Sequence, residues 1–187
     1  MKISQEFEVQ RPVDDVWAFF QEVPAVAQCL PGAELTEDKG GGAYAGKVSV
    51  KLGPITAAFE GEAVVEPDAS SSSGHMEGKG VDRRGGSRGR VGVDYRLRPS
   101  EAGTKVMVDA DVVLSGPAAQ FGRIGLIEEM SRRLIGQFVE CLEAKLAAPT
   151  AEEAASIHTG ELRGLSLFFS SLRGAVGAVS RRLFKRG

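Results

Sequence analysis

Residue types that carry enzyme chemistry are scarce in this 187-residue chain, which has two histidines, two cysteines, two tyrosines and one tryptophan. His75 and His158 have no ligand-type residues at metal-binding spacing, so we expect no metal site. The sequence contains no nucleophile elbow, and the glycine-containing segment 78–83 lacks the third glycine of a dinucleotide-binding fingerprint. These absences predict a protein without catalytic residues, which is therefore not an enzyme.

The two cysteines and the lengths of the apolar segments indicate in which cellular compartment the protein works. Cys29 and Cys141 lie far apart in the chain, each among apolar neighbours, which indicates two buried thiols rather than a disulfide or a metal framework. The first ten residues, MKISQEFEVQ, lack the apolar core of a secretory signal. No uncharged apolar run approaches the roughly 18 residues of a spanning helix. We therefore expect a cytoplasmic protein in a reducing compartment.

The charges are distributed unevenly although the net charge is only −2. Residues 161–187 hold six basic side chains and one acidic one, which leaves 17 basic and 24 acidic residues in 1–160. An acidic body argues against nucleic acid as a partner, and a basic tail indicates a partner of its own.

The hydrophobic pattern predicts a sheet followed by a helix. Apolar and polar residues alternate at 3–9 and again in successive runs from 33 to 115, with two short helices expected between them near 12–20 and 24–30. Turn-rich segments separate the runs at hairpin spacing, which indicates an antiparallel meander. Residues 117–147 change to helical period and predict one long helix of about 45 Å. The fold class is therefore α+β, with this helix across the apolar face of a curved sheet.

The apolar face of the predicted sheet carries unusually small residues. A packed core would use larger side chains there, so this set indicates an apolar cavity suited to a lipophilic molecule. The alternative is that the glycines mark bends or bulges of the sheet. Tyr44 and Tyr95 are the polar groups expected on the same face. The small residues are Gly46, Ala57, Gly61, Ala63, Gly78, Gly80 and Ala110.

Several segments within residues 1–147 resemble the G subunit of carbon monoxide dehydrogenase, a family of the START-like, helix-grip (SRPBCC) superfamily. The resemblance implies a hydrophobic cavity between the sheet and the long helix. It also implies a role in attaching a molybdenum hydroxylase to the cytoplasmic membrane, and it gives no catalytic residues. The segments are Val16-Trp17, Cys29-Leu30-Pro31-Gly32, residues 44–54, Phe59-Glu60-Gly61, Leu126-Ile127 and residues 138–142.

The expected cavity-lining residues come from the first short helix, the strands and the long helix. They are Trp17, Phe20, Val48, Val50, Phe59, Gly61, Met76, Val93, Tyr95, Val108, Ala110, Val112, Ile127, Met130 and Leu134.

The final segment, 161–187, has the pattern of an amphipathic helix that lies on a membrane surface. Its apolar residues share one helical face, and its basic residues are candidates for contact with anionic lipid. It follows a predicted linker at 148–160. Two alternatives are that the segment packs on the body of the protein or docks into a groove of a partner enzyme. The apolar positions are Leu165, Phe168, Phe169, Leu172, Val176, Val179 and Leu183, and the basic ones are Arg173, Arg181, Arg182, Lys185 and Arg186.

These observations together predict three parts: a START-like ligand-binding domain at 1–147, a linker, and a membrane-association tail. The expected function is that of an accessory protein on the inner face of the cell membrane. It would bind a lipophilic molecule, a quinone such as menaquinone, beside a redox enzyme complex. A pure tether without a ligand and a START-like cyclase or hydratase are the alternatives, and the enzyme would need more titratable groups on the inward face.

Overall fold

The computed structural model describes residues 1–52, 55–123 and 126–159, with side chains except at 51–55 and 121–130. In this part of the chain, seven strands form one antiparallel sheet in the order β1-β7-β6-β5-β4-β3-β2. Every neighbouring pair after β1 is a hairpin, and β1 pairs with the last strand. The strands are β1 (Lys2–Val9), β2 (Ala33–Gly40), β3 (Ala43–Leu52), β4 (Ile55–Asp68), β5 (Ser73–Asp82), β6 (Ser87–Ser100) and β7 (Gly103–Ser115).

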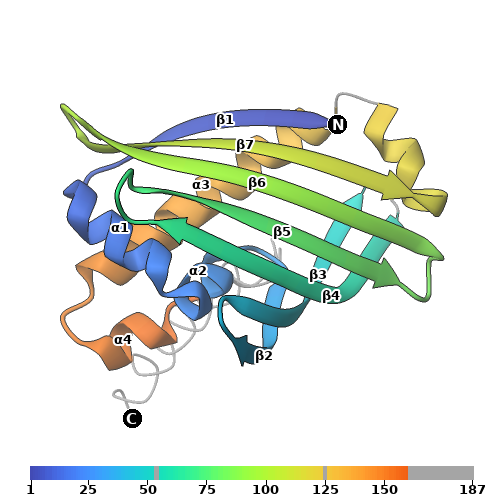
Figure 1. Ribbon diagram of the computed structural model, residues 1–187, viewed down its shortest axis with the longest axis horizontal. Helices are drawn as coiled ribbons and strands as arrows, with labels where there is room; N and C mark the ends of the chain where they lie inside the picture. Colours follow the sequence, from blue (N-terminus) through green and yellow to red (C-terminus); the bar gives the residue numbers. More distant parts are fainter. Residues whose placement is uncertain (53–54, 124–125, 160–187) are drawn as a thin grey trace, which may run out of the picture.

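Helices cover one face of this sheet (Figure 1). The long helix α3 packs against β1 and α2, whereas α1 contacts β6 and β7 and α2 contacts β2. The first two helices and α4 lie at one end of the sheet, and η1 and the β5–β6 hairpin lie at the other (Figure 1). This arrangement confirms the predicted helix-grip architecture. The helices are α1 (Val13–Gln21), α2 (Val23–Cys29), the 3-10 helix η1 (Gly116–Arg123), α3 (Leu126–Ala147) and α4 (Ala151–Ser156).

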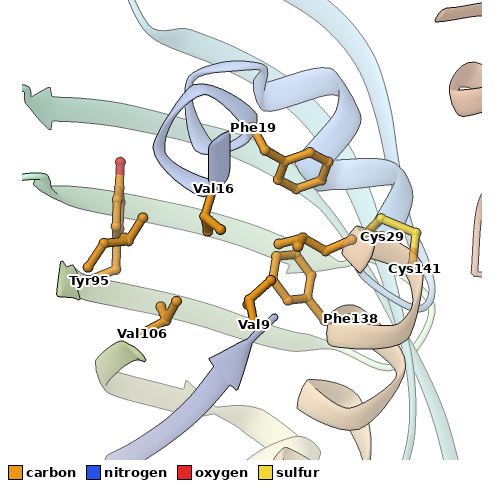
Figure 2. Close-up of a cluster of buried hydrophobic side chains, with 10 residues drawn as sticks. Val9, Val16, Phe19, Cys29, Tyr95, Val106, Phe138 and Cys141 are labelled. Atoms are coloured by element: carbon orange, nitrogen blue, oxygen red, sulfur yellow. A yellow bond between two sulfur atoms is a disulfide. The ribbon is translucent and has the colours of Figure 1, made fainter. Parts of the chain in front are cut away.

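The core lies where α1, α2 and the second half of α3 meet β1, β6 and β7. Phe138 makes edge-to-face contacts with Phe7, Phe19 and Phe20, with ring centroids 6.0–6.5 Å apart, and Figure 2 shows Val16, Phe19 and Phe138 converging beside Cys29 and Cys141. The buried members of the core are Val9, Val16, Phe19, Cys29, Tyr95, Leu97, Val106, Phe138, Cys141 and Leu142.

The prediction for the cysteines was half right. Cys29 and Cys141 are buried, but they form a disulfide that joins α2 to α3, with Cα atoms 5.4 Å apart. Sequence spacing could not reveal this because the two helices become neighbours only once the sheet has folded between them. Because the two cysteines are bonded to each other, they give no reason to expect a reducing compartment.

Two further segments differ from the sequence-based expectation. The long helix begins only at Leu126 and has 22 residues, about 33 Å at 1.5 Å per residue, because residues 116–123 form η1 instead. Residues 148–160, expected as a linker, contain α4, whose N-terminus is capped by the Thr150 hydroxyl accepting from the Glu153 amide at 3.2 Å. The Thr159 amide donates to the Gln28 carbonyl at 3.1 Å, so the chain is held against α2 up to this point.

Candidate functional site: the inner face of the sheet

The inner face of the sheet is defined by the side chains that share the side of the core residues Tyr95, Leu97 and Val106. Strand register carries this face outward from the core: Tyr95 pairs with Val108, and Val93 pairs with both Met76 and Ala110. Because side chains alternate across a strand, these positions all point to the helix side. The predicted strand residues thus fall on one continuous apolar surface.

Exposure on this surface rises away from the core. Tyr95 is buried, Met76 and Val93 are half-buried, and Val48 on β3 is 44% exposed although it faces inward. Each of these groups would be worth about 1.5–3 kcal/mol if it were fully removed from water. The inner face therefore holds apolar area that the protein's own described residues do not fully cover.

A row of four glycines crosses the inner face in register. Gly46 pairs with Gly61, Gly61 with Gly80, and Gly80 with Gly89. A Cβ at Gly61 would overlap the Lys79 carbonyl oxygen on β5, and one at Gly46 would lie 2.8 Å from the Glu34 carbonyl oxygen on β2. At these two positions, glycine is required by the close approach of neighbouring strands. The small residues at these two positions therefore do not indicate free space, and a register shift of β2 between Leu35 and Glu37 lies beside Gly46 alone.

The aromatic end of the inner face lies under α1. The Phe20 and Tyr95 ring centroids are 5.3 Å apart, and the Tyr95 ring lies over Gly74, where a Cβ would overlap it. Burial raises the pKa of the Tyr95 phenol, and burial, followed by the charge of Asp38, raises that of Tyr44. Both groups are therefore neutral hydrogen-bond donors near neutral pH.

The predicted lining residues are placed as follows. Trp17 and Phe20 on α1 pack against the core, and Leu134 on α3 is half-buried. Val50, Phe59, Val108, Ala110 and Val112 are half-buried inner-face residues, and Gly61 belongs to the glycine row. Ile127 and Met130 lie in α3, but their side chains are outside those described. The whole predicted tail, 161–187, also lies outside the described residues.

Sequence reasoning missed Lys145, which is 7% exposed. Its Nζ donates to the Gln28 side-chain oxygen and to the Ala154 carbonyl, both at 2.7 Å, and so ties α3 to α2 and α4. Burial lowers the pKa of this ammonium. A lysine in the last helical turn is a common sequence feature, so only tertiary packing reveals its role. Gly89 was also missed, because its place in the glycine row depends on strand register.

Charged groups lie on the outer face. His75 lies on β5, where its Nδ1 is 2.7 Å from Asp94 Oδ1 and its Nε2 is 3.7 Å from Glu77 Oε1. The hydrogen bond to Asp94, more than the charges of Asp94 and Glu77, raises the pKa of His75. Within the described residues, no three His, Cys, Asp or Glu side chains are grouped to hold a metal ion.

The β5–β6 hairpin is basic. Asp82 Oδ1 accepts from the amides of Arg84 and Gly85 at 3.0 and 2.8 Å, which fixes the turn. The arginines Arg83, Arg84, Arg88 and Arg90 are exposed, and none forms an ion pair with another residue in the described ranges. Exposed charges of this kind are typical of a solvated turn.

A sheet curved around one long helix, with two short helices closing an end, defines the helix-grip, START-like class of proteins. Solved structures of this shape include a conserved protein from Geobacillus kaustophilus, with a TM-score of 0.66 and 15% identity over 79% of this chain and 95% of that one. A Chromobacterium violaceum protein matches with a TM-score of 0.55 and 20% identity, over 79% of this chain and 97% of that one. A Thermus thermophilus protein matches with a TM-score of 0.53 and 15% identity, over 78% of this chain and 97% of that one.

These likenesses show the fold alone. The chain belongs to the CoxG family, the G subunit of carbon monoxide dehydrogenase, whose model matches residues 6–147. None of the curated proteins matches the chain significantly. In the part of the chain that the structure describes, no helix is both long and apolar enough to cross a bilayer.

Proposed function

We propose that this protein is a non-catalytic accessory subunit that holds a lipophilic molecule, a respiratory quinone such as menaquinone, against the inner face of its sheet. In this role it links a molybdenum hydroxylase of the carbon monoxide dehydrogenase type to the inner face of the cell membrane. Membership of the CoxG family supports the accessory role. The observation that carries the ligand proposal is the incompletely covered apolar inner face.

The physical argument concerns the solubility of the electron acceptor. A prenylated quinone is nearly insoluble in water, so an enzyme outside the bilayer needs a protein surface that shields the acceptor. Val48, Phe59 and Met76 offer apolar area on the helix side of the sheet, and covering such area with a ligand is favourable by about 25 cal/mol per Å². The inner face thus has the chemistry that such a ligand requires.

The proposed membrane contact is the tail, 161–187. The chain reaches Thr159 while bound to Gln28 of α2 through both its amide and its hydroxyl. The last described residue before the tail therefore lies beside the end of the fold where α1 and α2 close the sheet. Its six basic residues and its phenylalanines suit the surface of an anionic bilayer.

One observation favours a second candidate, a tether that carries no ligand. At Gly61 and Gly46, glycine serves the close approach of strands rather than free space. If the remaining inner-face area is covered by the side chains of 121–130, the body would act as a solid adaptor. The membrane and enzyme partners would be the same in both cases.

Quinone extraction from vesicles tests the proposal. The full chain is mixed with anionic vesicles that contain menaquinone, the vesicles are removed by sedimentation, and quinone is measured in the supernatant. Because the tail should sediment the wild type with the vesicles, quinone transfer is measured in the Phe168→Glu, Phe169→Glu background, which should stay in the supernatant and carry quinone into it. Ala110→Phe should reduce the yield about tenfold, because Ala110 lies between Val93 and Ile3 on the inner face, and overpacking costs roughly 1–3 kcal/mol.

The matched control is Val113→Phe on the outer face of the same strand, where Val113 is 59% exposed. In the same background it should carry as much quinone as the parent protein. Phe168→Glu combined with Phe169→Glu should release the protein from the vesicles while leaving its binding of quinone in detergent unchanged. A quinone-free supernatant of the Phe168→Glu, Phe169→Glu protein, with the wild type bound to vesicles, would favour the tether.

A further inference from the structure

The hydroxyl group of Tyr95 is a buried polar atom that has no hydrogen-bond partner among the described residues. Tyr95 itself is 9% exposed. Most buried polar groups of native proteins have a partner, and leaving one without lowers the stability of the fold. A phenylalanine would fill the same space without this cost. The hydroxyl therefore requires an explanation beyond packing.

The position of this hydroxyl is fixed by the ring that carries it. Tyr95 pairs directly with Gly74 of β5, and its ring lies over that glycine. Phe20 of α1 contacts the ring at a centroid distance of 5.3 Å. In Figure 2, Tyr95 and its oxygen lie on the opposite side of Val16 from Phe138 and the disulfide. The hydroxyl thus lies on the inner side of the sheet, at the side of the core that the Phe138 cluster does not occupy.

The surroundings of the hydroxyl are apolar. One register row away, Met76, Val93 and Ala110 form half-buried apolar surface. Because burial raises the pKa of the phenol, the group stays protonated near neutral pH and can donate. An apolar surface that ends in one oriented donor fits a ligand with a hydrophobic body and a single acceptor oxygen at its end.

We propose that the Tyr95 hydroxyl donates a hydrogen bond to a carbonyl oxygen of the bound lipophilic molecule. The ligand is then a prenylated carbonyl compound such as a quinone. A plain isoprenoid hydrocarbon is excluded, because it has no oxygen to accept the hydrogen bond. This inference rests on the proposed function. Because the hydroxyl has no exposed surface in the structure, the ligand reaches it only when a neighbour such as the half-buried Phe20 changes its rotamer.

The test compares two probes on three proteins. The probes are menaquinone with two isoprene units and the same prenylated methylnaphthalene ring without its oxygens. The proteins are the full-length wild type, Tyr95→Phe, and Val113→Phe on the outer face of the sheet as the control. Binding is followed by the fluorescence of Trp17, the single tryptophan, which packs against the core.

We expect Tyr95→Phe to weaken quinone binding about tenfold, which corresponds to the loss of a hydrogen bond worth about 1.4 kcal/mol. Its affinity for the hydrocarbon probe should change less than about twofold, and Val113→Phe should bind both probes as the wild type does. The infrared carbonyl band of the bound quinone should lose its hydrogen-bonded component in Tyr95→Phe alone. Without ligand, Tyr95→Phe should unfold at the same urea concentration as the wild type or a higher one.

Several results would overturn the inference. Equal quinone affinity of the wild type and Tyr95→Phe would show that the hydroxyl does not contact the ligand. Equal weakening of both probes would mean that Tyr95 acts through packing only. A lower unfolding midpoint of ligand-free Tyr95→Phe would mean that the hydroxyl already has an internal partner. If neither probe binds the wild type, the proposed function fails along with this inference, a result distinct from the other three.

Discussion

Single glycines of the sheet and of the long helix have opposite effects on stability. Gly61 lies where β4 and β5 approach so closely that a Cβ would overlap the Lys79 carbonyl oxygen, whereas Gly136 of α3 is exposed and has nothing within 4 Å. Both are glycines within regular elements, and propensity alone would predict that alanine stabilises each. The difference lies in the neighbouring backbone.

We expect Gly61→Ala to lower the free energy of unfolding by about 1–3 kcal/mol, because the strand backbone must shift. Gly136→Ala should raise it by about 1 kcal/mol through helix propensity. Urea denaturation followed by circular dichroism measures both. A stabilising Gly61→Ala would mean that this position faces free space, as the cavity interpretation of the sequence required.

At the residue scale, the contribution of His75 to folding stability depends on pH. Its folded-state pKa is raised, first by the hydrogen bond to Asp94, so folding favours the protonated form. The contribution to stability is fully present below the unfolded pKa of about 6.5 and is lost as the pH rises through the higher folded pKa. Between the unfolded and the folded pKa, the folded state binds more protons than the unfolded state, so the stability falls as the pH rises.

We expect an NMR titration of the His75 ring to give a pKa above about 6.5 in the wild type. Asp94→Asn should bring it back toward that value, because it removes the largest cause of the shift. An unchanged His75 pKa in Asp94→Asn would contradict the contact.

At the scale of elements, a disulfide and several hydrogen bonds connect α2 to its neighbours. Its Cys29 is bonded to Cys141 of α3, and the adjacent Gln28 accepts from Lys145 and from Thr159. These links join α2, α3, α4 and the segment before the tail. The stability of this corner therefore depends on the disulfide more than on the short helices themselves, which are 7 and 6 residues long.

We expect Cys29→Ala to lower the free energy of unfolding by about 2–4 kcal/mol, since the disulfide restricts the unfolded chain. The double variant with Cys141→Ala should lose little more than the single one, because both remove the same link. Dithiothreitol should lower the free energy of unfolding of the wild type by a similar amount and leave that of the double variant unchanged. Two thiols that react with iodoacetamide in the denatured, unreduced protein would contradict the disulfide.

The elements show which features the sequence could predict. Alternation placed Val48, Met76 and Val93 on one face, because the period of a strand is local information. The α4 helix also has a local signal in the Thr150 cap and Glu153. The disulfide and the η1 helix, by contrast, depend on contacts between segments that are distant in the chain. The same limit applies to the site: the inner-face residues could be predicted, but the register that aligns the four glycines could not.

At the scale of the whole molecule, the fold brings an incompletely covered apolar face and the start of the basic tail into one domain. The face lies between sheet and helices, and the chain leaves α2 at Thr159 toward residues 161–187. A lipophilic cargo and a membrane contact would then be carried by the same small protein. This coupling is the central claim of the proposed function.

The most direct measurement is organic-solvent extraction of the full-length protein purified from quinone-producing cells, followed by mass spectrometry of the extract. The account predicts a prenylated quinone that co-purifies with the wild type and with Val113→Phe, and that is strongly reduced in folded Ala110→Phe. Extracts that contain no isoprenoid, or equal amounts from the wild type and Ala110→Phe, would contradict it.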